Sequence, residues 1–145
     1  MILPTKEITH RTSVRVRYAD TDKMGVVYNA VYLVYFEVGR TELMRKVGLA
    51  YTEFENAGYH LPLTEAHLTY HQPAFYDDEL IIEAFVKPEY KPLIKFEYNI
   101  FRGETTIVSG WTIHSFINSM MKPVKPPKIF IDTINNYYKK KQLEK

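Results

Sequence analysis

Two aspartates, Asp20 and Asp22, lie in the segment Tyr-Ala-Asp-Thr-Asp-Lys-Met-Gly-Val-Val-Tyr-Asn (residues 18–29), directly before a long apolar run. A carboxylate can attack a thioester or ester carbonyl, giving a mixed anhydride, or it can activate water as a general base. Negative charge then grows on the carbonyl oxygen, where free N–H groups at a helix N-terminus stabilise it. Asp22 and the N–H groups of Tyr28 and its neighbours could do this chemistry. The spacing alone also fits aspartates that only shape an Asx-turn.

The flanking elements would position this loop. Alternation of Val14, Val16 and Tyr18 with polar residues predicts a half-buried strand over 13–18. Asn29 is a good N-cap and Gly48 a good residue just past a C-terminus, so a helix is expected over 30–47, about 27 Å long. Its first half is apolar nearly all round, which predicts that the fold encloses it.

The rest of the chain favours an antiparallel sheet. A short helical turn is expected within 50–60, and alternating or apolar segments then predict strands at 65–71, 80–86, 93–101 and 105–118. A tail helix over 128–141 would place Phe130, Ile134 and Tyr137 on one face. This order predicts an α+β fold and a single domain over 1–145, with one curved antiparallel sheet wrapped around one long buried helix. Apolar residues on the other sheet face predict packing against a second subunit.

Composition excludes several classes of function. The 145 residues carry a net charge of only +2, which argues against a dedicated nucleic-acid binder. The absence of cysteine excludes disulfides, thiolate nucleophiles and Cys-based metal sites. No apolar stretch is long enough for a signal peptide or a membrane span, so we expect a cytoplasmic protein without an integral membrane segment. Gly-x-Ser-x-Gly, Walker and Gly-x-Gly-x-x-Gly motifs are also absent.

The loop at 18–29 resembles the signature of the hotdog-fold acyl-CoA thioesterases, in particular the 4-hydroxybenzoyl-CoA thioesterase group with its bacterial Tol-Pal-associated acyl-CoA thioesterase relatives. Weaker matches follow along roughly residues 10–130. They are Tyr-Phe-Glu at 35–37, Arg-Thr-Glu at 40–42, Tyr-Asp-Asp-Glu-Leu at 76–80 and Gly-Trp-Thr-Ile-His at 110–114.

The resemblance implies a hotdog fold and hydrolysis of acyl-CoA to a carboxylic acid and coenzyme A. It makes Asp22 the catalytic carboxylate and the backbone N–H of Tyr28 the oxyanion donor, with no metal or redox cofactor. It also implies a homodimer or homotetramer with each active site between protomers. A binding module that kept the fold but lost the chemistry, and a hydratase or dehydratase, remain the alternative functions.

Departures from the family pattern affect the substrate site. Asn29 stands where many relatives have histidine, which predicts an altered rate or substrate range. Coenzyme A phosphates need Lys or Arg at the rim, and Lys91 and Lys87 flank a strand turn where the hydroxybenzoyl enzyme is more basic. Lys122, Lys125 and Lys128 are further candidates in the proline-rich tail.

Three more ionisable residues have two interpretations each. Glu37 matches the helix glutamate that another hotdog branch uses in catalysis, but an ion pair with Arg40 is the simpler expectation. His67 and His71 would lie about 13 Å apart on a strand, too far to share a metal ion. Because His67 alternates with the apolar set, it is instead a candidate for lining the acyl pocket.

Overall fold

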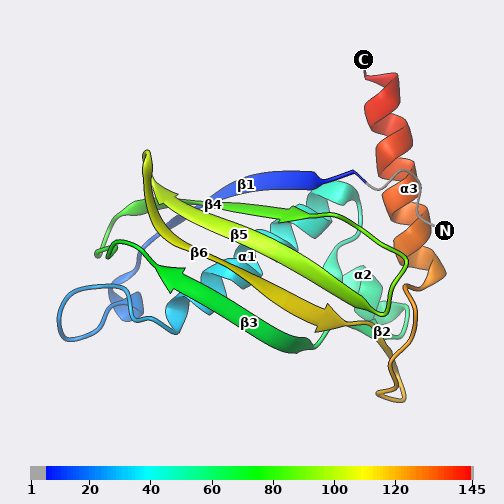
Figure 1. The fold of residues 1–145 in the computed structure, drawn as a ribbon, viewed down its shortest axis with the longest axis horizontal. Helices are drawn as coiled ribbons and strands as arrows, with labels where there is room; N and C mark the ends of the chain where they lie inside the picture. The colour runs from blue at the N-terminus through cyan, green and yellow to red at the C-terminus, as the bar shows by residue number, and fades with distance from the viewer. Residues whose placement is uncertain (1–5, 145) are drawn as a thin grey trace.

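A long helix, α1 (Val31–Val47), lies against one face of an antiparallel sheet in the computed structural model, which describes residues 6–144 (Figure 1). The sheet order is β1-β4-β5-β6-β3, and each neighbouring pair is antiparallel. The strands are β1 (Ile8–Arg15), β4 (Glu79–Val86), β5 (Leu93–Arg102), β6 (Thr105–Ser115) and β3 (Leu63–Tyr70). The predicted α+β hotdog arrangement is therefore confirmed.

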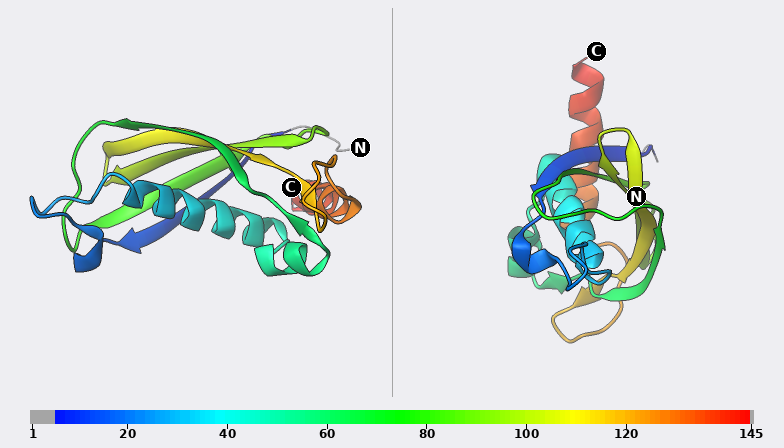
Figure 2. Two further views of the ribbon diagram at one scale, coloured as in Figure 1. Left: turned by 90° about the horizontal axis from the view of Figure 1, so that it is seen from below. Right: turned by 90° about the vertical axis from the view of Figure 1, so that its left-hand side faces the viewer.

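The smaller elements gather at one end of the sheet. A two-stranded ribbon joins β2 (Tyr59–His60) to β7 (Ile117–Asn118), next to α2 (Tyr51–Asn56). The tail helix α3 (Lys128–Leu143) lies at the same end and projects away from the sheet (Figures 1 and 2). None of the described helices is long and apolar enough to cross a membrane.

The core lies between α1 and the concave face of the sheet. Phe36 stacks on Tyr98 of β5, with ring centroids 4.1 Å apart. Gly39 faces β4 so closely that a Cβ at that position would lie 2.6 Å from Cγ2 of Ile82, and a larger residue there would push the helix away. The helix ends at Gly48, whose φ of 110° is the left-handed conformation expected just past a C-terminus.

The first half of α1 is buried on one side only. Tyr32, Tyr35 and Phe36 face the core, whereas Val34 is 52% exposed and Leu33 is also open to solvent. The expectation of an enclosed helix is thus met only on the side that faces the sheet. Neighbouring β3 is the edge strand, and seven of its eight residues are exposed, including Leu63 and Tyr70.

Three local expectations differ from the structure. Tyr18 does not continue β1: it belongs to a 3-10 turn (Tyr18–Asp20) and is 79% exposed. The N-cap of α1 is Ala30, without a side-chain cap, rather than Asn29. On α3 the buried tyrosine is Tyr138, four residues after Ile134, while Tyr137 is half-buried.

Candidate functional site

Asp22 shapes a tight turn and keeps part of its carboxylate accessible. Its Oδ1 accepts hydrogen bonds from the backbone N–H groups of Met24 (2.8 Å) and Val26 (3.4 Å), and the side chain is half-buried. Its own N–H donates to the carbonyl oxygen of Val26 at 2.9 Å. In the described part of the chain, Oδ2 has no hydrogen-bond partner. The turn-forming and catalytic interpretations of Asp22 are therefore compatible, because one oxygen fixes the loop and the other is available.

Asp20 has a structural environment instead. It is only 5% exposed, and its Oδ2 accepts hydrogen bonds from the backbone N–H of Arg17 (3.0 Å) and the hydroxyl of Tyr35 (2.9 Å). The Arg17 guanidinium also lies 3.0 Å from Oδ1. Desolvation by burial acts to raise the pKa of Asp20, but these hydrogen bonds from Arg17 and Tyr35 together lower it. The carboxylate is ionised and fully engaged in holding the loop against α1.

The backbone N–H that was expected as the oxyanion donor, that of Tyr28, already has an acceptor in the structure. The backbone N–H of Tyr28 donates to the carbonyl oxygen of Asp20 at 2.9 Å, so it is not available to a substrate. The N–H of Val31 donates to the carbonyl oxygen of Tyr28, also at 2.9 Å. Between them, the N–H groups of Asn29 and Ala30 make no hydrogen bond within residues 6–144. The assignment of Tyr28 is corrected: the free donors at the start of α1 belong to Asn29 and Ala30.

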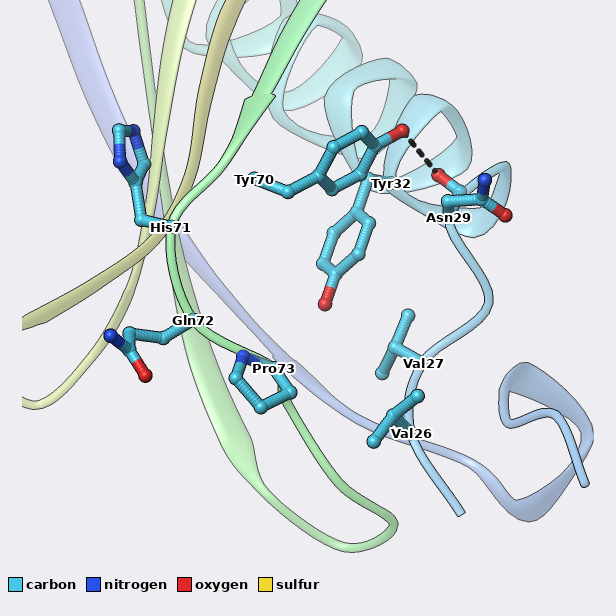
Figure 3. A pocket seen from close by; sticks show the side chains of 8 residues that line it. All are labelled: Val26, Val27, Asn29, Tyr32, Tyr70, His71, Gln72 and Pro73. Carbon is cyan, nitrogen blue, oxygen red and sulfur yellow. Dashed lines mark hydrogen bonds between the residues drawn. The ribbon is translucent and has the colours of Figure 1, made fainter. Parts of the chain in front are cut away.

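A cavity of about 270 Å³ opens beside this helix start (Figure 3). Tyr32 and Tyr70 project into it, with ring centroids 5.8 Å apart, and the Tyr70 hydroxyl donates to the carbonyl oxygen of Asn29 at 3.2 Å. Asp22 does not line the cavity, but its bonded neighbour Val26 does. The lining residues are Val26, Val27, Asn29, Tyr32, Tyr70, His71, Gln72 and Pro73.

Two tyrosines of this cavity were not identified as site residues from the sequence. Tyr70 reads as an ordinary member of an alternating strand, and Tyr32 as part of an apolar helix. The only usable signal was the richness in tyrosine, since this residue favours half-wet pockets. Placing them required knowing that the end of β3 meets the start of α1.

The predicted substrate-binding lysines lie far from Asp22 in the same chain. Lys87 and Lys91 flank the β4–β5 turn, at the opposite end of the sheet from loop 18–30 (Figure 1). Both are exposed, and Lys91 is 2.8 Å from the carboxylate of Glu89, which raises the pKa of Lys91. Within one chain, the structure does not bring either lysine to the candidate site.

His67 also lies outside the cavity. Its ring stacks on Trp111, with centroids 5.6 Å apart, on the face of the sheet that points away from α1. Within one chain, His67 therefore does not line this cavity, because its side chain lies on the sheet face opposite to α1. His71 is one of the lining residues of the cavity, and its Nε2 lies 2.8 Å from the hydroxyl oxygen of Ser109 (Figure 3). No group of residues able to hold a metal ion occurs within 6–144.

A family model described as the thioesterase-like superfamily matches residues 16–131. The chain belongs to this superfamily. It is 36% identical to acyl-CoA thioesterase YbgC of Haemophilus influenzae over 118 residues, which cover 79% of this chain and 86% of that protein. It is 31% identical to YneP of Bacillus subtilis over 134 residues, which cover 91% of this chain and 97% of that protein.

A solved structure in the same superfamily has a similar fold. The DHNA-CoA thioesterase from Staphylococcus aureus superposes with a TM-score of 0.82 at 29% identity, covering 93% of this chain and 91% of that chain. The share of the chain that superposes is larger than the segment of roughly residues 10–130 in which the sequence motifs resemble the family.

Proposed function

We propose that this chain hydrolyses acyl-CoA thioesters, with Asp22 as the catalytic carboxylate and the backbone N–H of Asn29 as the principal oxyanion donor. One observation carries the proposal: Oδ2 of Asp22 accepts no hydrogen bond within the described residues, while Oδ1 is bonded to the N–H of Val26, which lines the cavity. The same cavity lies beside the free N–H groups at the start of α1. The names of relatives, an acyl-CoA thioesterase and a DHNA-CoA thioesterase, support coenzyme A as the carrier.

The reaction needs only groups that the chain possesses. The thioester carbonyl oxygen would accept hydrogen bonds from the N–H groups of Asn29 and Ala30 as charge develops on it. The carboxylate of Asp22 would either attack the carbonyl carbon, expelling the thiolate and leaving a mixed anhydride for water to open, or take a proton from the attacking water. Both routes consume one water and release a carboxylic acid and the coenzyme A thiol.

A second copy of the chain would complete the site. The edge strand β3 has unpaired backbone groups along its outer side, and Val34, Leu63 and Tyr70 form an exposed apolar border beside it. Antiparallel pairing of two β3 strands about a two-fold axis would cover this border. It would also carry the β4–β5 turn of the partner to the end where Asp22 lies. Lys87 and Lys91 could then contact coenzyme A phosphates across the dimer interface.

The test is thiol release across a panel of aromatic and aliphatic acyl-CoA substrates, followed with a thiol-reactive dye. Turnover in the wild type and its loss in Asp22→Asn support the proposal. Binding without thiol release would instead identify a binding module, and hydration of enoyl-CoA without free thiol would identify a hydratase. Either outcome overturns it. Single turnover in labelled water then separates the two routes, because label enters Asp22 only through the mixed anhydride.

A further inference from the structure

Three cavities follow one another along α1 on the side that faces the edge strand. The first, of about 270 Å³, contains Asn29 and Tyr70 at the end of β3. The second, of about 230 Å³, lies between α1 and the start of β3 and is lined by Leu33, Val34, Glu37, Arg40, Leu63 and Thr112. The third, of about 260 Å³, shares Glu37 and Arg40 and continues toward α2. Arg40 thus lies where the second and third cavities meet, and we refer to the three cavities, taken in this order along α1, as the groove.

Arg40 is a half-buried cation without an anionic partner. No carboxylate of residues 6–144 lies within ion-pair distance of its guanidinium, and the expected pair with Glu37 is absent. Its one hydrogen bond runs from Nη1 to the hydroxyl oxygen of Tyr98, at 3.1 Å. The other guanidinium N–H groups therefore remain available beside the apolar walls of the groove. A partly desolvated arginine of this kind binds carboxylates well, because its planar fork donates two parallel hydrogen bonds.

A buried chain of hydrogen bonds fixes the position of Arg40. The Tyr98 and Thr112 hydroxyls are 2.6 Å apart, and Oγ1 of Thr112 is 2.9 Å from Nε2 of His114. Nδ1 of His114 lies 3.0 Å from the carbonyl oxygen of Leu61. If His114 is neutral, each donor has one acceptor. Arg40 donates to Tyr98, the Tyr98 hydroxyl to Thr112, the Thr112 hydroxyl to Nε2 of His114, and Nδ1–H of His114 to the Leu61 carbonyl oxygen. This series of hydrogen bonds engages only Nη1 of the guanidinium and leaves its other N–H groups facing the groove.

The position of Arg40 relative to Asn29 suggests what the guanidinium would bind. Asn29 lies in the turn just before α1, whose N-cap is Ala30. Within the helix, Leu33 and Arg40 are seven residues apart, close to two full turns, so these two share one stripe of α1. From Ala30 to Arg40 the distance along the axis is about 15 Å at 1.5 Å per residue. Leu33 lies between them and lines the second cavity. An acyl chain whose carbonyl is held at Asn29 would thus run over apolar surface before its far end reaches Arg40.

We propose that Arg40 binds a carboxylate at the distal end of the acyl group, so that the preferred substrates are ω-carboxyacyl thioesters. The inference rests on the proposed thioesterase function, because Asn29 sets the position of the reacting carbonyl. Glu37 lines the same two cavities and would repel this carboxylate, but it is exposed to solvent and so is screened more than Arg40. Arg40 is a specificity residue that does not touch the reacting atoms.

The experiment compares kcat/KM for ω-carboxyacyl-CoA with kcat/KM for the simple acyl-CoA of equal carbon number, from decanedioyl to hexadecanedioyl, because shorter chains do not span the distance to Arg40. The ratio should favour the ω-carboxy substrate in the wild type and fall about 10- to 100-fold in Arg40→Gln, as expected for loss of a charge-assisted hydrogen bond. Loss of folded protein cancels in this ratio. Arg45→Gln is the matched control, because Arg45 is exposed on the same helix and paired with Glu42.

Two further variants sharpen the result. Tyr98→Phe should lower the ratio less than Arg40→Gln, since it frees the guanidinium but keeps its charge. Glu37→Gln should raise the ratio, because it removes the repulsion. An unchanged ratio in Arg40→Gln, or a wild-type preference for ω-hydroxyacyl over ω-carboxyacyl substrates, would overturn the inference while leaving the thioesterase intact.

A binding measurement separates the two proposals if hydrolysis fails. Non-hydrolysable thioether analogues of dodecanedioyl-CoA and dodecanoyl-CoA can be titrated calorimetrically into wild type and Arg40→Gln. Selective loss of affinity for the ω-carboxy analogue would support the role of Arg40 even if no thioester is cleaved. Equal affinities of both proteins for both analogues would reject it.

Discussion

The backbone N–H of Tyr28 is bonded to the carbonyl oxygen of Asp20, 2.9 Å away. This bond ties the two ends of loop 20–28 together, while the carboxylate of the same Asp20 is bonded to Tyr35 of α1. Asp20 thus connects the loop to the helix through both its main chain and its side chain. The free N–H groups begin one residue later, at Asn29, so this bond determines which N–H groups are available to the proposed oxyanion site.

Removing the N–H of Asn29 should therefore slow hydrolysis. Replacing Asn29 with its α-hydroxy acid converts that amide to an ester and deletes the donor without changing the side chain. We expect kcat to fall by about 10²- to 10³-fold, the usual effect of losing one oxyanion donor. Steady-state thiol release measures the effect. The same replacement at Tyr28 should mainly reduce stability, and a larger loss of kcat at Tyr28 than at Asn29 would contradict the assignment.

Exchange of each aspartate for asparagine should separate catalysis from structure. Asp22→Asn retains an oxygen that can accept from Met24 and Val26, so the turn should persist while kcat falls about 10²- to 10⁴-fold. Asp20→Asn removes the buried negative charge that accepts hydrogen bonds from the Arg17 backbone N–H and the Tyr35 hydroxyl, and should lower the free energy of unfolding by about 1–3 kcal/mol. Urea unfolding and thiol release on both variants give the comparison. Full activity of Asp22→Asn would reject its catalytic role.

Stability should fall in acid through His114. Burial, together with the charge of Arg40, lowers the pKa of His114 to about 4. The unfolded chain, with a pKa near 6.5, therefore binds this proton more readily than the folded one. The contribution of neutral His114 to the free energy of unfolding is fully present above about pH 6.5. It is lost as the pH falls toward 4, which lowers the free energy of unfolding by on the order of 3 kcal/mol. Protonation of His114 would also place two donors, Nε2–H of His114 and the Tyr98 hydroxyl, against Oγ1 of Thr112. The series of hydrogen bonds that ends at Arg40 would then be disrupted.

Urea titrations between pH 4 and 7 measure this effect. The variant His114→Gln keeps a polar side chain without a titrating group, so its stability should vary less over the same range. Parallel pH profiles of wild type and variant would show that the acid sensitivity originates elsewhere, for example at His10, whose pKa is also lowered by burial.

A charge on the open side of α1 should disrupt subunit association. Val34 is exposed in the single chain and lies beside Leu63 in the border that a second copy would cover. Val34→Glu should shift the protein to monomers in sedimentation experiments and reduce turnover with them. Met120→Glu, also a change of an exposed apolar side chain but in the turn after β7, should do neither. A wild type that sediments as a monomer at full activity would contradict the dimer.

Periodicity alone placed most of the fold. Alternation located β4, β5 and β6 to within a few residues, because each buries one face in the core. The edge strand β3 was also located by alternation, although seven of its eight residues are exposed in the single chain. Gly48 marked the end of α1 since its left-handed conformation favours glycine. The start of α1 was less certain because Ala30, which has no capping side chain, occupies the N-cap. Tyr18 failed as a strand residue because the chain turns there to bring Asp20 under α1.

The site depended on contacts that spacing does not encode. The motif pointed to Asp22, but the choice between Tyr28 and Asn29 depended on a single main-chain bond. Arg40 was expected to pair with Glu37 because the two are three residues apart. Instead, its guanidinium donates a hydrogen bond to the hydroxyl of Tyr98 in β5. His67 was misplaced because alternation gives two faces without saying which one meets the helix.

The close approach at Gly39 links the size of the substrate groove to the far side of the helix. The contact with Ile82 limits how deeply α1 can settle onto β4, and the groove runs along the opposite flank of that helix. Trimming Ile82 would let α1 sink toward the sheet and widen the channel without altering any residue that lines it. A substitution at Ile82 could then change the preferred length of the acyl chain, although Ile82 contacts no substrate and every residue that lines the groove stays unchanged.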